Sequence, residues 1–162
     1  MSPNESHDGS ALLAGLKQES AAWQALLQVM QEEEQALVDG DADRLALLNA
    51  AKLTQLQAVS DHAQSRLAGL RAAGHAPDHS GMAAWLAQHA HPDLLARWQQ
   101  LSDMEQEAQA LNQRIGALIE LRLSSTRQAL NVLIHSATRQ GGLYDNAGLA
   151  VAAHKGKPLA AA

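Results

Sequence analysis

The chain has no cysteine, no phenylalanine and few aromatic side chains of any kind. Of its 162 residues, 2% are aromatic, namely three tryptophans and one tyrosine. The absence of cysteine excludes disulfides, thiol nucleophiles and cysteine-ligated zinc within this chain. The scarcity of aromatics argues against a compact globular core, because large aromatic side chains normally supply much of its buried area.

The chain also lacks long apolar runs and an excess of positive charge. No stretch approaches the roughly 18 apolar residues of a membrane-spanning helix, and residues 1–8 lack the basic and apolar regions of a signal peptide. The formal net charge of −5 argues against nucleic-acid binding, which needs clustered Lys and Arg. The sequence predicts a cytoplasmic protein that neither inserts into membranes nor binds nucleic acid.

Leucine, alanine, glutamine and glutamate dominate what is present, and these residues favour helices. We predict an all-α fold: an elongated antiparallel helical bundle or coiled coil of three long helices and one short helix, with a flexible C-terminal tail. Apolar residues spaced by alternating steps of four and three, typical of a coiled-coil seam, predict the first helix over residues 10–38. Its expected inward positions are Leu16, Ser20, Trp23, Leu27, Met30, Glu34 and Leu37.

A short turn separates the first helix from a second one over residues 42–72. Gly40 can adopt the left-handed conformation that ends a helix, and Asp41 or Asp43 can cap the next one. A turn this short predicts an antiparallel hairpin. Lys52 falls on the apolar stripe of the second helix, where we expect its methylenes to pack and its ammonium group to reach water.

The remaining chain is predicted to form a loop, a short helix and a long helix. Turn residues favour a loop over residues 73–81, and a helix is expected over residues 82–89. Pro92 suits a helix start, and no proline interrupts the chain from there to about Ala137. Within this helix Gly116 permits either a close helix crossing or a bend. The expected organisation is a flexible segment 1–9, a helical bundle 10–139 and a flexible tail 140–162.

No residue pattern predicts catalysis, a metal site or a cofactor. Serines and histidines occur without a nucleophile elbow or a glycine-rich phosphate loop. The histidines His75, His79, His89 and His91 lack the spacing of metal ligands and are interpreted as solvated loop residues. The acidic run in residues 1–40 and the other carboxylates are expected on solvated helix faces, so an enzyme is not predicted.

The long helix has more apolar surface than one packing stripe uses. With Ile115 at 0° and about 100° per residue, Leu118, Ile119, Leu130 and Leu133 fall on the expected packing face. Other apolar residues lie well to either side, beyond the width of an ordinary amphipathic stripe. Either both other helices cover this broad face, or part of it receives a partner helix. The candidate partner-binding residues are Ile115, Leu118, Leu121, Leu123, Leu130, Val132 and Ile134.

The polar, glycine-bearing tail carries the only tyrosine of the chain. Tyr144, preceded by Leu143, is either folded back onto the bundle or serves as an anchor that orders on docking to a partner.

In order and spacing, several of these elements resemble the FlgN-type flagellar export chaperones. They are the Gly40-Asp41 turn after an acidic helix end, Lys52, the Leu-Asn-Gln of residues 111–113 followed by Gly116, and the segment 128–133. The Leu143-Tyr144 pair, Gly148 and residues 154–157 complete the resemblance. The pattern departs from common members at Asp145-Asn146, where a glycine often follows the tyrosine.

The resemblance implies a cytoplasmic chaperone that is not an enzyme and needs no cofactor. It implies that the clients are hook–filament junction (hook-associated) proteins, held by their C-terminal helical segments near residues 111–134. It also implies that Leu143 and Tyr144 dock at the flagellar type III export apparatus. The alternative is a structural coiled-coil adaptor or stalk component without clients, and the sequence leaves the oligomeric state open.

Overall fold

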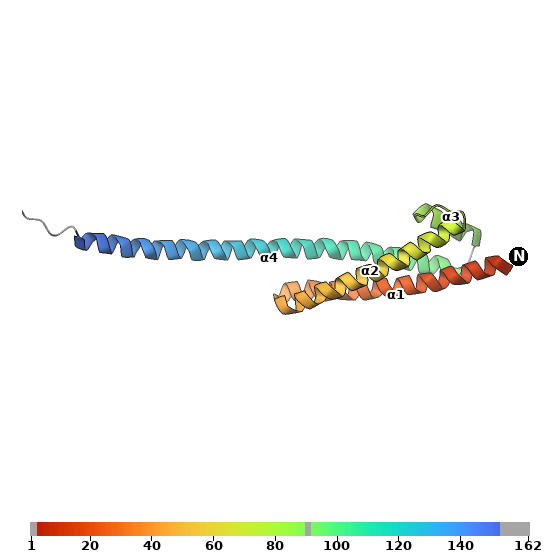
Figure 1. The fold of residues 1–162 in the computed structure, drawn as a ribbon, viewed down its shortest axis with the longest axis horizontal. Helices are drawn as coiled ribbons and strands as arrows, with labels where there is room; N and C mark the ends of the chain where they lie inside the picture. The colour runs from red at the N-terminus through yellow and green to blue at the C-terminus, as the bar shows by residue number, and fades with distance from the viewer. Residues whose placement is uncertain (1–2, 90–91, 153–162) are drawn as a thin grey trace, which may run out of the picture. The chain divides into compact units, whose positions relative to one another are not determined.

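The computed structural model describes the backbone of residues 3–89 and 92–152 and the side chains of residues 11–89 and 92–139. Within these residues the elements are α1 (Pro3–Asp39), α2 (Ala42–Ala72), α3 (His79–His89) and α4 (Pro92–Ala152), shown in Figure 1. The predicted all-α fold of three long helices and one short helix is confirmed. The chain divides into two compact units, residues 1–118 and residues 119–162.

Two helices extend further than the sequence predicted. α1 begins at Pro3 rather than near Ser10, because proline fits the first turn of a helix, where its missing N–H has no intrahelical role. α4 ends at Ala152 rather than near Ala137. No proline lies between 93 and 152, and glycine lowers helix stability without removing a hydrogen-bond donor. The flexibility of segments 1–9 and 140–162 stays a prediction.

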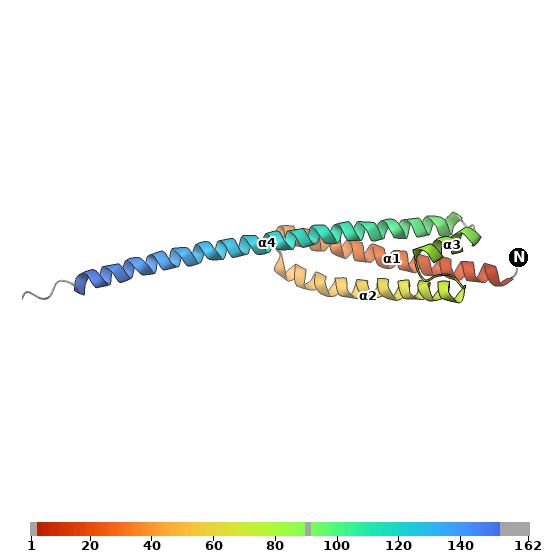
Figure 2. The ribbon, with the colours of Figure 1, turned by 90° about the horizontal axis from the view of Figure 1, so that it is seen from above.

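The turn between α1 and α2 has the predicted chemistry. Gly40 has a φ of 74°, and the carboxylate of Asp41 accepts a hydrogen bond from the backbone N–H of Arg44 at 3.0 Å. This contact caps the first turn of α2. The two helices lie antiparallel and side by side in both views (Figures 1 and 2).

α3 begins at His79, three positions before the predicted Met82, because Asp78 supplies an N-terminal cap. Its carboxylate accepts from the hydroxyl of Ser80 at 2.7 Å and from the N–H of Gly81 at 2.8 Å. These hydrogen bonds lower the pKa of Asp78. A Cβ on Gly81 would lie 1.8 Å from the carbonyl oxygen of Ala76, so the tight entry to α3 requires glycine there.

The first unit holds an apolar core to which all four helices contribute. Leu16, Leu26, Leu70, Met82 and Leu111 are among its most completely buried side chains. Further members from α3 and α4 are Trp85, Leu86, Leu94, Trp98, Leu101, Met104, Ala108 and Ile115. Figure 2 shows the beginning of α4 running beside α1.

The predicted seam of α1 is largely confirmed, with two positions at its margin. Leu16, Ser20, Leu27, Met30 and Leu37 are buried. Trp23 and Glu34 are instead half-buried. The hydroxyl oxygen of Ser20 has no hydrogen-bond partner among the described residues.

Two carboxylates of α1 are buried, which corrects the expectation that all carboxylates lie on solvated faces. Glu19 accepts two hydrogen bonds from Arg66 of α2, at 2.8 and 3.1 Å, and Glu33 accepts one from Lys52 at 2.7 Å. The ammonium group of Lys52 therefore pairs with a carboxylate within the hairpin, a partner that the sequence did not predict. Such partners are required because an unpaired buried charge is costly.

The Arg66 guanidinium also lies 4.8 Å from the ring centroid of Trp98 in α4, a cation–π contact. α1 and α4 are joined directly by Glu34, which accepts from Arg114 at 2.8 Å. The hydrogen bond to Glu34 raises the pKa of Arg114. Polar contacts thus join three helices around the apolar core of the first unit.

Candidate functional site

In the second unit the side chains of residues 119–139 of α4 are described, and all of them are exposed. A helix in water normally presents polar residues, with large apolar ones confined to a packed stripe. Here seven large apolar side chains are between 41% and 66% exposed. They form the apolar surface, defined as Ile119, Leu121, Leu123, Leu130, Val132, Leu133 and Ile134.

The predicted partner-binding residues divide between the two units. Ile115 is 2% exposed and belongs to the core of the first unit, and Leu118 is half-buried against that core. The other five predicted residues belong to the apolar surface. Ile115 therefore contributes to folding of the first unit, and the exposed candidates begin after Leu118.

Sequence reasoning missed Ile119 and Leu133 as exposed residues. Both were assigned, with Leu130, to the face that packs on the other helices, yet all three are exposed. At about 100° per residue they share one side of α4 with Leu123 and Ile134, whereas Leu121 and Val132 lie roughly opposite. Apolar side chains thus occupy both sides of this helical segment.

Several polar side chains of this segment bond to the helix itself. Thr126 donates from its hydroxyl to the carbonyl oxygen of Arg122 at 2.9 Å, and Nδ1 of His135 lies 2.8 Å from the carbonyl oxygen of Asn131. These groups are paired locally and assemble no acid–base centre. Chemically, residues 119–139 offer apolar area on a helical scaffold, which suits another polypeptide.

Leu143 and Tyr144, the predicted docking residues, fall within the backbone bounds of α4. Their side chains lie outside the described residues. The predicted docking role is therefore carried forward as a proposal.

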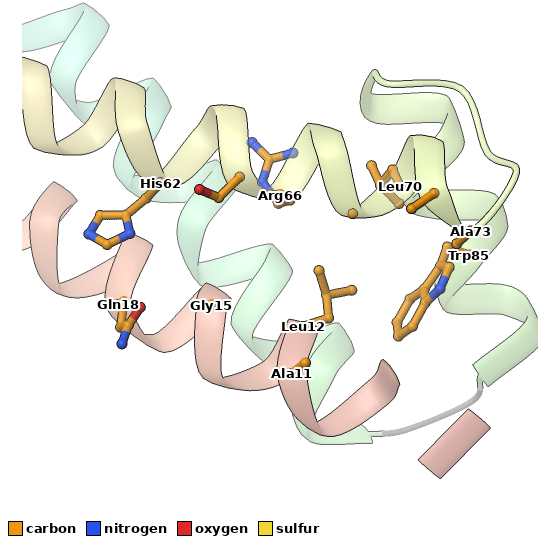
Figure 3. A pocket seen from close by; sticks show the side chains of 12 residues that line it. Ala11, Leu12, Gly15, Gln18, His62, Arg66, Leu70, Ala73 and Trp85 are labelled. Carbon is orange, nitrogen blue, oxygen red and sulfur yellow. The ribbon is translucent and has the colours of Figure 1, made fainter. Parts of the chain in front are cut away.

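A cavity of about 510 Å³ in the first unit is a second candidate, bounded by α1, α2 and α3. Figure 3 shows Gln18 and His62 at one end of it and Trp85 at the other. Small residues such as Gly15 and Gly69 open the wall, and a Cβ at either glycine would meet no atom within 4 Å. Because no carboxylate lines this cavity, it lacks the paired acids of a hydrolytic centre.

Two of the histidines that were interpreted as solvated loop residues contact tryptophans. His79 and His89 belong to α3; the imidazole of His89 stacks on Trp85 with ring centroids 3.9 Å apart, and that of His79 lies 5.0 Å from Trp98. His91 lies outside the described residues. Throughout the part of the chain that the structure describes, no three His, Asp or Glu side chains gather as metal ligands. Across the same residues, no helix is long and apolar enough to cross a membrane.

Comparisons with known proteins identify a family that this chain matches. The family model described as FlgN protein matches residues 8–152. Among solved structures, the chain is similar to a flagella synthesis protein FlgN from Pseudomonas aeruginosa, with 30% sequence identity and a TM-score of 0.60. That similarity covers 67% of this chain and 86% of the other. No curated protein matches the sequence significantly.

Proposed function

This chain belongs to the FlgN family, and from that premise we propose that it is a cytoplasmic chaperone of flagellar export. Its clients are the hook–filament junction (hook-associated) proteins, which it binds through their C-terminal helical segments. Binding covers apolar side chains of the client and prevents premature assembly. The complex is then delivered to the flagellar type III export apparatus. This role requires neither a catalytic group nor a cofactor.

The exposure of the apolar surface supports client binding. Contiguous apolar side chains on a protein surface often mark sites where another protein binds. A partner helix can cover such a surface through anchors spaced three or four residues apart. A contact with few anchors also dissociates readily, which suits a client that must be released for export.

The test is binding of purified junction proteins to the full-length chain carrying Leu123→Asp and Leu130→Asp. We expect at least about a 100-fold loss of affinity, since two buried charges replace two apolar anchors. The matched control is Leu47→Asp with Leu53→Asp, because these α2 leucines are 75% and 69% exposed. The control should bind as the unaltered chain does.

Equal loss in both variants would reject residues 119–139 as the client site. If no junction protein binds the unaltered chain, the alternative of a structural adaptor without clients is favoured. Circular dichroism should show the same helical content in all three proteins, because each altered position is exposed.

Delivery is proposed to depend on Leu143 and Tyr144. An aromatic side chain beside a leucine can anchor a segment that orders when it docks. Tyr144→Ala should leave junction-protein affinity unchanged and reduce secretion of those proteins into the medium. A loss of client affinity in this variant would instead assign Tyr144 to the client site.

A further inference from the structure

The exposed segment of α4 contains a coiled-coil seam. The seam consists of residues separated by alternating steps of four and three along the helix. The side chain of each of these residues is exposed. This spacing is the a/d pattern of a coiled coil. We define the seam as Ile119, Leu123, Thr126, Leu130, Leu133 and Ala137.

The polar member of the seam can be buried at little cost. Thr126 already donates its hydroxyl hydrogen to the carbonyl oxygen of Arg122 at 2.9 Å. A hydroxyl that keeps its hydrogen bond does not become an unsatisfied donor when a partner covers it. The seam is therefore usable along its whole length from Ile119 to Ala137.

The charges beside the seam are mostly positive. With Ile119 at position d, the flanking g and e positions around Thr126 are Arg122 and Arg127, and Glu120 is the one acidic flank. Leu121 and Val132 occupy the outward positions f and c. Flanking e and g residues face the partner helix and choose it by charge.

The same sign extends over the whole second unit. Residues 119–162 contain five Lys or Arg and two Asp or Glu, whereas residues 1–118 contain seven and fifteen. The formal charges are thus +3 and −8, which together give the −5 of the chain. A basic apolar segment on an acidic protein attracts acidic partners.

A second copy of this chain is a poor occupant for the seam in a parallel, in-register pairing. In a parallel, in-register coiled coil, each g residue faces the e residue five positions later on the other helix. That register places Arg122 of one copy opposite Arg127 of the second copy, and symmetry repeats the repulsion. A partner with carboxylates at these flanks replaces both repulsions with attractions.

We propose that the seam binds an acidic amphipathic helix, with apolar residues at its a and d positions and carboxylates at the flanks that meet Arg122 and Arg127. This inference rests on the proposed client function and specifies the chemistry of the client segment. It predicts that the binding helices of the clients are acidic beside their apolar stripe.

The experiment uses the full-length chain and two synthetic 21-residue peptides that have leucine at every a and d position. One peptide carries glutamate at all e and g positions, and the other carries lysine there. Affinities are measured by fluorescence anisotropy at low salt. Only binding that Leu123→Asp with Leu130→Asp abolishes is counted, because the acidic first unit can attract the lysine peptide without the seam.

The acidic peptide should bind the seam at least about tenfold more tightly than the basic one. Arg122→Glu with Arg127→Glu should reverse that preference. The control Arg139→Glu changes an outward position and should preserve the preference.

Equal seam-dependent affinity for both peptides would overturn the proposal, as would a reversal produced by Arg139→Glu alone. A dimer in sedimentation that Leu123→Asp with Leu130→Asp dissociates would overturn it by making a second copy the occupant. Junction-protein binding without a charge preference would reject this inference and leave the proposed function standing. Peptide selectivity without junction-protein binding would reject the proposed function alone.

Discussion

The two units of this chain differ in the exposure of the large apolar side chains of α4, which are mostly buried in the first unit and exposed in residues 119–139 of the second. Before Leu118, α4 turns Leu111 and Ile115 inward among the apolar residues of the other helices. In residues 119–139, leucines and isoleucines of the same helix are exposed. The share of apolar residues changes little between these segments, so apolar content alone does not show where a core ends. The two segments differ in whether other helices cover their apolar side chains.

The two units should differ most in the rates of their amide hydrogen exchange. A helix without tertiary packing depends on propensity alone and opens readily, whereas a packed helix opens with the core. Amides of residues 119–139 should exchange at least roughly 100-fold faster than those of residues 101–115. Mass spectrometry of the purified chain measures both segments together. Equal protection would show that the second unit is packed in solution.

Buried charge should be the next largest difference. Glu19→Ala leaves the Arg66 guanidinium without its carboxylate partner and should cost about 3–5 kcal/mol of unfolding free energy. Arg66 is 13% exposed, so water offsets little of that loss. The matched change Glu120→Ala, at an exposed position of the second unit, should stay within about 0.5 kcal/mol. Urea denaturation measures both, and equal costs would contradict the buried pair.

Leucine truncation sharpens the same contrast for apolar side chains. Leu111 is fully buried, and Leu111→Ala should lower the unfolding free energy by about 2–5 kcal/mol through lost contacts and a cavity. Leu121 is 66% exposed, and Leu121→Ala should change it by less than about 0.5 kcal/mol. A large loss for Leu121 in thermal denaturation would mean that the chain itself covers the apolar surface.

Two glycines of the first unit give the smallest and opposite effects. Gly81→Ala places a methyl group against the Ala76 carbonyl oxygen and should destabilise the fold by about 1–3 kcal/mol. Gly116 has no neighbour within 4 Å of an added Cβ, so Gly116→Ala should stabilise it by up to about 1 kcal/mol. Chemical denaturation distinguishes the signs. A destabilising Gly116→Ala would favour the bend that the sequence left open.

Part of the apolar surface could be predicted from the sequence because it depends on helix periodicity. Five of the seven predicted residues belong to the apolar surface, whereas Ile115 and Leu118 contact the core. The missed residues Ile119 and Leu133 share the core-facing side of the helix by angle, and angle does not reveal where packing stops. The lengths of the helices do indicate that packing stops, since α4 has 61 residues and α2 has 31. A helix of 31 residues is too short to cover all of α4.

The sequence by itself determined the helices, the Gly40-Asp41 turn and the antiparallel hairpin, because hydrogen bonds and caps within four residues fix them. Only the tertiary structure decided that Glu19 meets Arg66, 47 positions away. The tertiary structure likewise decided that the carbonyl oxygen of Ala76 occupies the space where a Cβ on Gly81 would lie. It also decided that packing of α4 on the core ends near Leu118. Those outcomes depend on which side chains that are far apart in the sequence lie together in the fold, and helix periodicity does not encode which ones do.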